Sequence, residues 1–139
     1  MKIIVSACLL GCNCRYDGNH SFNKKVNDFI KGHEVFLVCP EVEGGLPTPR
    51  IPAEINKDRK VINKEGQDVT SYFEKGAKEC LKVALNNQVD LAILKARSPS
   101  CGNKEIYDGT FSGKLIKGQG IFAKYLKKHN IIIINEEEL

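Results

Sequence analysis

An α/β fold, with a mostly parallel sheet flanked by helices, is what the sequence predicts from two observations. Short runs of β-branched and other apolar residues alternate along the chain with segments of helical periodicity. Between them one segment, residues 53–69, alternates loosely in polarity, which is typical of a small β-hairpin. Strands that alternate with helices imply parallel βαβ units, so we expect a Rossmann-like sheet with the hairpin as an insertion.

Four short apolar runs are predicted to form the strands of the sheet. They cover residues 2–7, 34–38, 91–94 and 130–135. Runs of this length that are apolar almost throughout are typical of strands buried on both faces of a parallel sheet. The first run stops just before Cys8 and the second just before Cys39, so both cysteines are expected at the carboxyl ends of strands.

Helical patterns lie between these runs. The clearest covers Asp68–Asn87, where apolar side chains recur at helical spacing between lysines and glutamates. Either Asp68 or Thr70 is expected to cap the start of this helix, because both have side chains that accept hydrogen bonds from free amides. A second helix is predicted over Gly120–Lys128, and a third, weaker one over Lys24–Lys31.

Length and composition match one globular domain, residues 1–139. The hydrophobic share of 42% is ordinary and excludes a disordered chain. The longest apolar run, Ile131–Ile134, is far too short for a membrane helix, and the N-terminus lacks the apolar stretch of a signal peptide. We therefore expect a cytoplasmic protein. A net charge of +4 is too mild to indicate a nucleic-acid partner and suits a small anionic ligand equally well.

The chain has six cysteines, which in a reducing compartment are metal ligands, nucleophiles or core residues rather than disulfides. Cys8 and Cys39 end two predicted strands, and Cys101 lies in the loop after a third. Because the carboxyl ends of parallel strands meet at one edge of a sheet, these three thiols are expected to converge there. Cys80 lies on the apolar stripe of the long helix and is expected in the core.

Two metal sites are compatible with these cysteines. One is a local zinc site without the usual CxxC pairs. Its ligands would be Cys8, Cys12, Cys14 and His20. The other is a [4Fe–4S] cluster held by Cys8, Cys39 and Cys101. Three thiolates on four irons would leave one iron open to substrate, which is the mark of a catalyst rather than of an electron carrier.

Five motifs follow one another along the chain. They are VSACLLG at residues 5–11, CRYDG at 14–18, CPEV at 39–42, GGLPTPR at 44–50 and SPSCG at 98–102. Together they resemble the DUF523 family, which includes the thiouracil desulfidases, and the similarity covers nearly the whole chain. The resemblance implies an oxygen-sensitive [4Fe–4S] cluster on Cys8, Cys39 and Cys101. It also implies hydrolytic removal of sulfur, as sulfide, from thiouracil or a thiouridine nucleotide.

Three polar residues are candidates for catalysis in this reaction. Glu41, two positions after Cys39, is expected to deprotonate the attacking water, or else to pair with a nearby arginine. Ser98 and Ser100 precede Cys101 and are expected to hydrogen-bond the pyrimidine edge or the developing negative charge. Their alternative role is to shape the turn, since serine and proline are common in loops.

Four further residues are candidates for binding substrate. Arg15 and Arg50 could grip a ribose phosphate, for which arginine offers two parallel hydrogen bonds, or could anchor loops by ion pairs. Tyr16 could stack on a flat base or simply pack. Lys95 ends the third strand and is expected at the same edge of the sheet.

Two functions of other classes fit the same cysteines. One is a non-catalytic iron–sulfur module that carries sulfur or senses redox state. The other is a zinc hydrolase that uses the local zinc site. A brown protein after anaerobic purification would favour a cluster, and a colourless zinc protein would favour the hydrolase.

Overall fold

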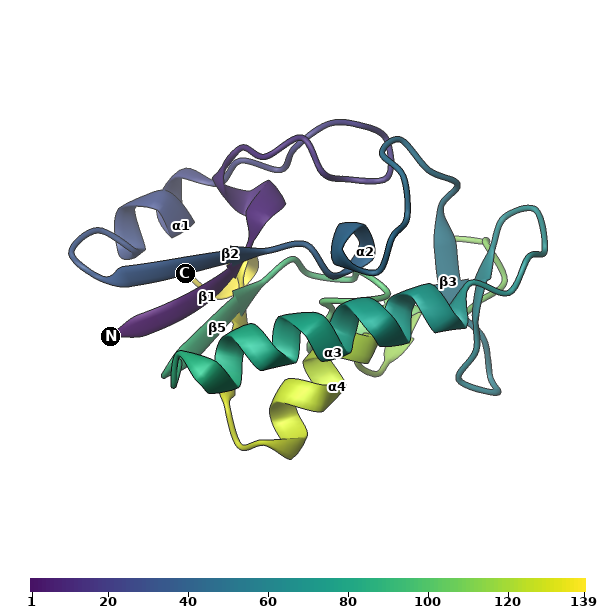
Figure 1. Ribbon diagram of the computed structural model, residues 1–139. Coiled ribbons are helices and arrows are strands. Elements are labelled where there is room, and N and C mark those ends of the chain that lie inside the picture. The colour runs from purple at the N-terminus through teal and green to yellow at the C-terminus, as the bar shows by residue number, and fades with distance from the viewer.

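Four parallel strands form the central sheet of the computed structural model, which describes residues 1–139 (Figure 1). They are β1 (Lys2–Ser6), β2 (Glu34–Val38), β5 (Leu91–Leu94) and β8 (Ile132–Asn135), in the order β2-β1-β5-β8 across the sheet. The register places Ser6 beside Val38 and Val5 beside Ile93. All carboxyl ends therefore lie along one edge, and the predicted α/β fold is confirmed.

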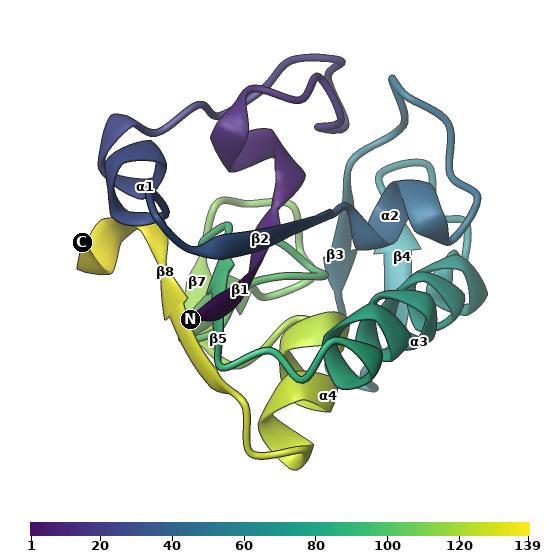
Figure 2. The ribbon, with the colours of Figure 1, turned by 60° about the vertical axis from the view of Figure 1, so that its left-hand side comes forward.

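Helices cover both faces of this sheet (Figures 1 and 2). They are α1 (Lys24–Phe29), α3 (Thr70–Asn86) and α4 (Ile121–Lys128). Successive residues of a strand point to opposite faces, so Ile4 of β1 packs with α3 and α4, whereas Ile3 and Val5 pack with Val26 of α1. No helix of the chain is long and apolar enough to span a bilayer.

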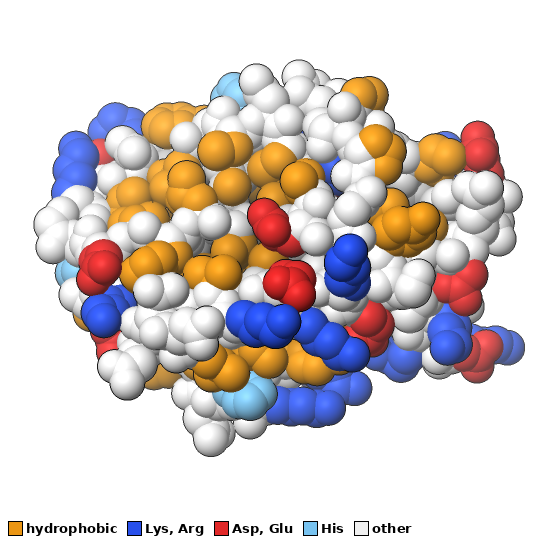
Figure 3. Space-filling view, in the orientation of Figure 1, with side chains coloured by type: hydrophobic (Ala, Val, Ile, Leu, Met, Phe, Trp, Pro, Cys, Tyr) orange, Lys and Arg blue, Asp and Glu red, His pale blue; other side chains and the backbone are white.

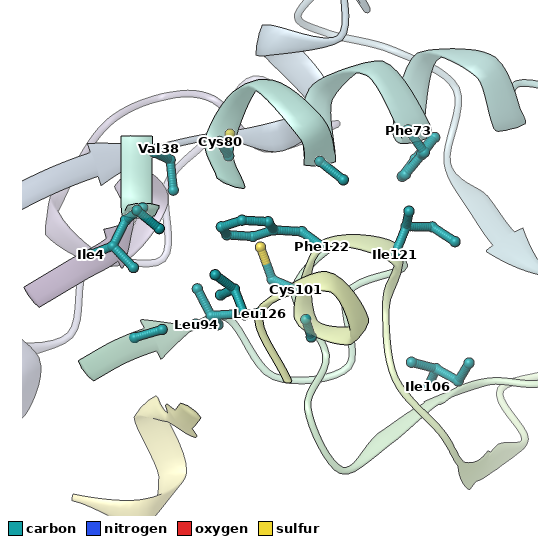
Figure 4. Packing of buried hydrophobic residues seen from close by; sticks show 14 of the residues in the cluster. Ile4, Val38, Phe73, Cys80, Leu94, Cys101, Ile106, Ile121, Phe122 and Leu126 are labelled. Carbon is teal, nitrogen blue, oxygen red and sulfur yellow. The ribbon is translucent and has the colours of Figure 1, made fainter. Parts of the chain in front are cut away.

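The larger core lies between the sheet and the helices α3 and α4. Phe122 of α4 is fully buried there, and Figure 4 shows Cys101 beside its ring. Cys80 is fully buried on the inner face of α3, as predicted. The core therefore extends from the helices to the loop that carries Cys101, which ties that loop to the rigid part of the fold.

Several element ends differ from the prediction. The first strand stops at Ser6, because Ala7–Leu10 turns into a short 3-10 helix, η1. The last strand starts at Ile132 rather than at residue 130, since Asn130 has a left-handed backbone (φ 59°) that ends the turn after α4. The N-cap position of α3 is Val69, which has no side-chain cap, but the expected Asp68 accepts the backbone N–H of Thr70, the first helical residue, at 2.9 Å.

Two antiparallel hairpins lie outside the main sheet. Their strands are β3 (Ala53–Ile55) with β4 (Val61–Asn63), and β6 (Glu105–Tyr107) with β7 (Leu115–Lys117). The first is the predicted insertion. The second was expected to be loop, because strands of three residues are too short to show an alternating pattern.

A short helix, α2 (Pro40–Glu43), follows Cys39 and was also expected to be loop. Proline is well suited to the first helical position, because its missing N–H has no partner there in any case. This helix packs against α3 at Gly76, where any Cβ would overlap the carbonyl oxygen of Pro40. The glycine of α3 thus allows the segment from Cys39 to Glu41 to sit close to the core.

The edge strand β2 pairs only with β1 and leaves one edge of the sheet unpaired. Its Leu37 is exposed, and Figure 3 shows apolar side chains gathered over this part of the molecule. Cys39, which follows directly, lies instead in the cavity at the carboxyl edge of the sheet.

Candidate active site

A cavity of about 420 Å³ opens at the carboxyl edge of the sheet, between the loops that follow β1, β2 and β5. All the residues suggested for the cluster, for catalysis and for substrate binding line it, namely Cys8, Cys39, Cys101, Glu41, Ser98, Ser100, Arg15, Tyr16, Arg50 and Lys95. Its size is ordinary for a small-molecule site. The topology thus brings together residues from three distant segments of the chain.

The three cysteines reach the cavity from three different elements. Cys8 lies in η1 directly after β1, Cys39 precedes α2, and Cys101 lies in the loop after β5. Cys8 and Cys101 are buried, with 8% and 4% of their surface exposed, and Cys39 is half-buried. All are free thiols.

Burial and hydrogen bonding change the pKa of two of these thiols, Cys39 and Cys101. Burial raises the pKa of Cys101 to about 12, although hydrogen bonds with Ser6 and Ser100 oppose the shift. A hydrogen bond with the Cys14 thiol, together with burial, raises the pKa of Cys39 well above its ordinary value. Thiolate ligands must lose their protons, so binding a metal group here would release protons.

The donor set fits an iron–sulfur cluster better than a single ion. No three His, Cys, Asp or Glu side chains stand close enough together to hold one metal ion. The cysteines are instead spread around a cavity, as a larger cluster with soft thiolate ligands requires. Cys8, Cys39 and Cys101 are thus suited to a [4Fe–4S] cluster.

The local zinc site is not assembled. Cys12 is exposed and does not line the cavity. His20 is exposed too, and its Nδ1 accepts the backbone N–H of Phe22 at 3.0 Å. The turn after η1 separates these two side chains from the buried thiol of Cys8, so the four suggested ligands do not converge.

Glu41 lies in a hydrogen-bonded network beside the cysteines. Its Oε1 accepts from Arg50 Nε at 3.0 Å, and its Oε2 accepts from Ser100 Oγ at 2.9 Å. The Ser100 hydroxyl also lies 3.6 Å from the thiol of Cys101. Each carboxylate oxygen can accept a second hydrogen bond, so Glu41 has capacity for a water molecule.

Ser98 shapes the turn that carries Cys101. Its hydroxyl oxygen accepts the backbone N–H groups of Ser100 at 3.1 Å and of Cys101 at 3.0 Å. It also lies 2.9 Å from the hydroxyl of Ser100. Ser98 therefore has the alternative role that was considered for it, to shape the turn, whereas the hydroxyl of Ser100 donates to Glu41.

Arg50 makes the loop-anchoring contacts that were its alternative role. Its side chain is only 6% exposed, and besides Glu41 it donates to the carbonyl oxygen of Cys14 at 2.8 Å. It also donates to the carbonyl of Pro47 and the hydroxyl of Thr48. Arg50 thus joins the loop after β1 to the loop after β2.

The other candidate binding residues also have partners within the chain. Arg15 Nη1 donates to Ser21 Oγ at 2.8 Å, and its guanidinium lies 5.8 Å from the ring centroid of the exposed Tyr16. Lys95 forms an ion pair with Glu136 at 2.8 Å. A role for any of them in binding substrate stays a prediction.

Glu54 and Tyr107 of the cavity lining were not singled out from the sequence, and Cys14 was considered only as a ligand of the local zinc site. Glu54 accepts the backbone N–H groups of Gly109 and Phe111 at 3.0 and 3.1 Å and joins the two hairpins. Tyr107 lines the cavity from β6, and Cys14 lines it beside Cys8 and Cys39. The CRYDG motif was the available signal for Cys14, but no predicted strand end placed it at this edge.

A family model, a relative and a solved structure each match nearly the whole chain. The model of the family described as 2-thiouracil desulfurase matches residues 3–138. The protein YbbK of Bacillus subtilis (strain 168) is 41% identical over 146 residues, which cover 99% of this chain and 97% of YbbK. The solved structure of TudS, a [4Fe–4S]-dependent thiouracil desulfidase, is also similar, with 41% sequence identity and a TM-score of 0.92. The match covers 99% of this chain and 92% of the TudS chain.

Proposed function

This chain belongs to the 2-thiouracil desulfurase family, and from that premise we propose that it is a [4Fe–4S]-dependent desulfidase of thiolated pyrimidines. The proposed reaction is hydrolytic: the thiocarbonyl sulfur leaves as sulfide, and the oxygen of a water molecule takes its place. No electrons are gained or lost. The observation that carries the proposal is one cavity lined by three cysteines from separate elements and by Glu41.

Cys8, Cys39 and Cys101 would hold the cluster. When bound, the cluster supplies a Lewis-acidic iron that none of these three thiolates ligates and that suits the soft sulfur of a thiocarbonyl group. The burial of Cys8 and Cys101 keeps bulk water away from these two ligands. The cavity volume of about 420 Å³ leaves room for a flat six-membered ring as well.

Glu41 is the proposed general base. Arg50 and Ser100 hold its carboxylate in one orientation, and each oxygen has a free acceptor position for a water molecule. A positioned base accounts for about 10²–10⁴-fold of the rate in comparable reactions. Ser100 then has two tasks, to orient Glu41 with its hydroxyl proton and to accept a hydrogen bond from an N–H of the pyrimidine edge with its oxygen.

Arg15, Tyr16 and Lys95 are the proposed contacts for the rest of the substrate. The Tyr16 ring is exposed beside the Arg15 guanidinium, so both can cover a flat base. Arg50 is fully engaged within the protein, and Arg15 is therefore the arginine that would bind the phosphate of a nucleotide substrate.

Anaerobic reconstitution tests this function. We expect a brown protein with four irons per chain that converts thiouracil to uracil and sulfide and incorporates oxygen from ¹⁸O-labelled water. Activity should disappear in air. Full activity without bound iron would overturn the proposal. A loaded protein that releases no sulfide from any thiopyrimidine base, nucleoside or nucleotide would support a sulfur-carrying or redox-sensing role instead.

A further inference from the structure

Glu54 offers one unoccupied carboxylate oxygen to the cavity. Its Oε1 accepts two hydrogen bonds, from the backbone N–H groups of Gly109 at 3.0 Å and of Phe111 at 3.1 Å. Neither of these donor residues lines the cavity, whereas the partly buried Glu54 does. The second oxygen, Oε2, has no hydrogen-bond partner within the chain, and nothing in the proposed reaction uses it. It is therefore an acceptor that a bound ligand can occupy.

The turn between β6 and β7 fixes the orientation of this carboxylate. Gly109 has a left-handed backbone (φ 95°), and a Cβ there would lie 2.7 Å from the Cα of Asn56, so glycine lets the turn come this close to β3. Phe111 also has a left-handed backbone (φ 55°), which is uncommon for a residue with a side chain. The backbone of one hairpin thus holds the Glu54 side chain of the other.

The proposed substrate has a donor for this oxygen. A uracil ring has an N3–H group, and N3 is bonded to the carbon that carries sulfur in both 2-thiouracil and 4-thiouracil. N3–H is present in the free base and in the nucleotide, since the ribose is attached at N1. In a cytosine ring, N3 has a lone pair in place of the hydrogen. A carboxylate only accepts hydrogen bonds, so it attracts the uracil N3–H and repels the cytosine N3.

We propose that Glu54 Oε2 accepts the N3–H of the substrate and thereby makes the site selective for thiolated uracils over thiolated cytosines. This inference rests on the proposed function, because it takes a thiolated pyrimidine as the ligand. In the free base, N1–H remains as the donor for Ser100. A hydrogen bond to a charged group contributes more than one between neutral groups, and an unpaired buried partner is costly. One such contact can therefore decide between two rings of equal size.

Glu54→Gln tests the assignment, because the backbone contacts dictate how the new amide lies. The two backbone N–H groups require an oxygen at the position of Oε1, so the NH₂ group replaces Oε2 and turns the acceptor into a donor. The variant should therefore reject N3–H and bind the N3 lone pair of 2-thiocytosine. Glu105→Gln is the matched control, because Glu105 is exposed on β6 and does not line the cavity.

The measurement is kcat/KM of the cluster-loaded proteins for 2-thiouracil and for 2-thiocytosine. We expect Glu54→Gln to lose about 10–100-fold with 2-thiouracil and to gain about tenfold or more with 2-thiocytosine. Glu105→Gln should match the wild type with both. Urea unfolding of Glu54→Gln should give nearly wild-type stability, because both backbone hydrogen bonds remain. A purely structural role of Glu54 would instead lower kcat/KM for both substrates together.

Binding of the oxygen-containing pyrimidines gives a second readout that needs neither turnover nor a variant. Cluster-loaded wild type is titrated with 1-methyluracil and with 3-methyluracil in a calorimeter. We expect 1-methyluracil, which keeps N3–H, to bind about tenfold more tightly or better than 3-methyluracil, which lacks it. Equal affinities for the two would overturn the assignment of N3–H to Glu54.

The outcomes separate this inference from the proposed function. If cluster-loaded wild type releases no sulfide from either thiopyrimidine, the proposed function fails, while the calorimetry still tests Glu54. If wild type converts 2-thiouracil and Glu54→Gln keeps the wild-type ratio between the two substrates, only the Glu54 assignment is overturned. A loaded wild type that neither converts nor binds any of these pyrimidines would overturn both.

Discussion

The hydroxyl of Ser100 donates a hydrogen bond of 2.9 Å to the carboxylate of Glu41, although 59 positions of sequence separate the two residues. Glu41 belongs to the helix after β2, and Ser100 belongs to the loop after β5. The bond therefore joins two of the three segments that carry the cysteines. Because Ser100 precedes Cys101, the proposed base and one proposed cluster ligand are placed by the same contact.

Glu41→Gln should abolish most turnover without removing the cluster. The amide keeps the shape of the carboxylate and can still accept a hydrogen bond, but it cannot take a proton from water. We expect kcat to fall by about 10²–10⁴-fold with unchanged visible absorption. Glu43→Gln is the matched control, because Glu43 is exposed on the same helix and does not line the cavity. Wild-type turnover in Glu41→Gln would exclude Glu41 as the base.

Replacement of Cys8, Cys39 or Cys101 by alanine should each prevent assembly of the four-iron cluster. The measurement is iron and sulfide per chain after anaerobic reconstitution, with the absorption spectrum. Cys80→Ala is the control, because Cys80 is fully buried in the core and does not line the cavity. It should keep four irons and lose about 1 kcal/mol of unfolding free energy. A Cys39→Ala protein with a complete cluster would contradict the ligand set.

Phe122→Ala should be among the most destabilising substitutions in the chain. Its ring is fully buried against the loop of Cys101, and emptying such a site costs about 3–5 kcal/mol. Urea unfolding of the cluster-free protein measures the loss. Phe22→Ala, at a side chain that is 50% exposed, should change the unfolding free energy by less than about 0.5 kcal/mol. Equal effects of the two would contradict the described core.

Gly76→Ala should damage the site although it lies in a helix. In an ordinary helix this change stabilises by about 0.5–1 kcal/mol, because glycine is a poor helix former. Here the new methyl group would overlap the carbonyl oxygen of Pro40 and push α2 away from α3. We expect lower stability in urea and weaker retention of iron, because Cys39 and Glu41 flank Pro40. A stabilised variant with normal iron content would show that α2 does not depend on this close contact.

Much of this architecture could be predicted from the sequence. The apolar runs at residues 34–38 and 91–94 matched strands to the residue, since buried parallel strands need nearly continuous apolar side chains. The second hairpin and α2 could not be predicted, because elements of three or four residues are too short to show a period. Arg50 had two possible roles, and its sequence neighbours could not decide between them.

By itself, the sequence determined that Cys8, Cys39 and Cys101 would meet, because each follows a strand and parallel strands end at a common edge. Only the tertiary structure decided that Cys14 joins them and Cys12 does not. Cys14 follows no strand, and the path of its loop depends on the hydrogen bond from Arg50, 36 positions further along the chain. Local sequence patterns report the elements in which residues lie, whereas the course of an irregular loop is set by its distant partners.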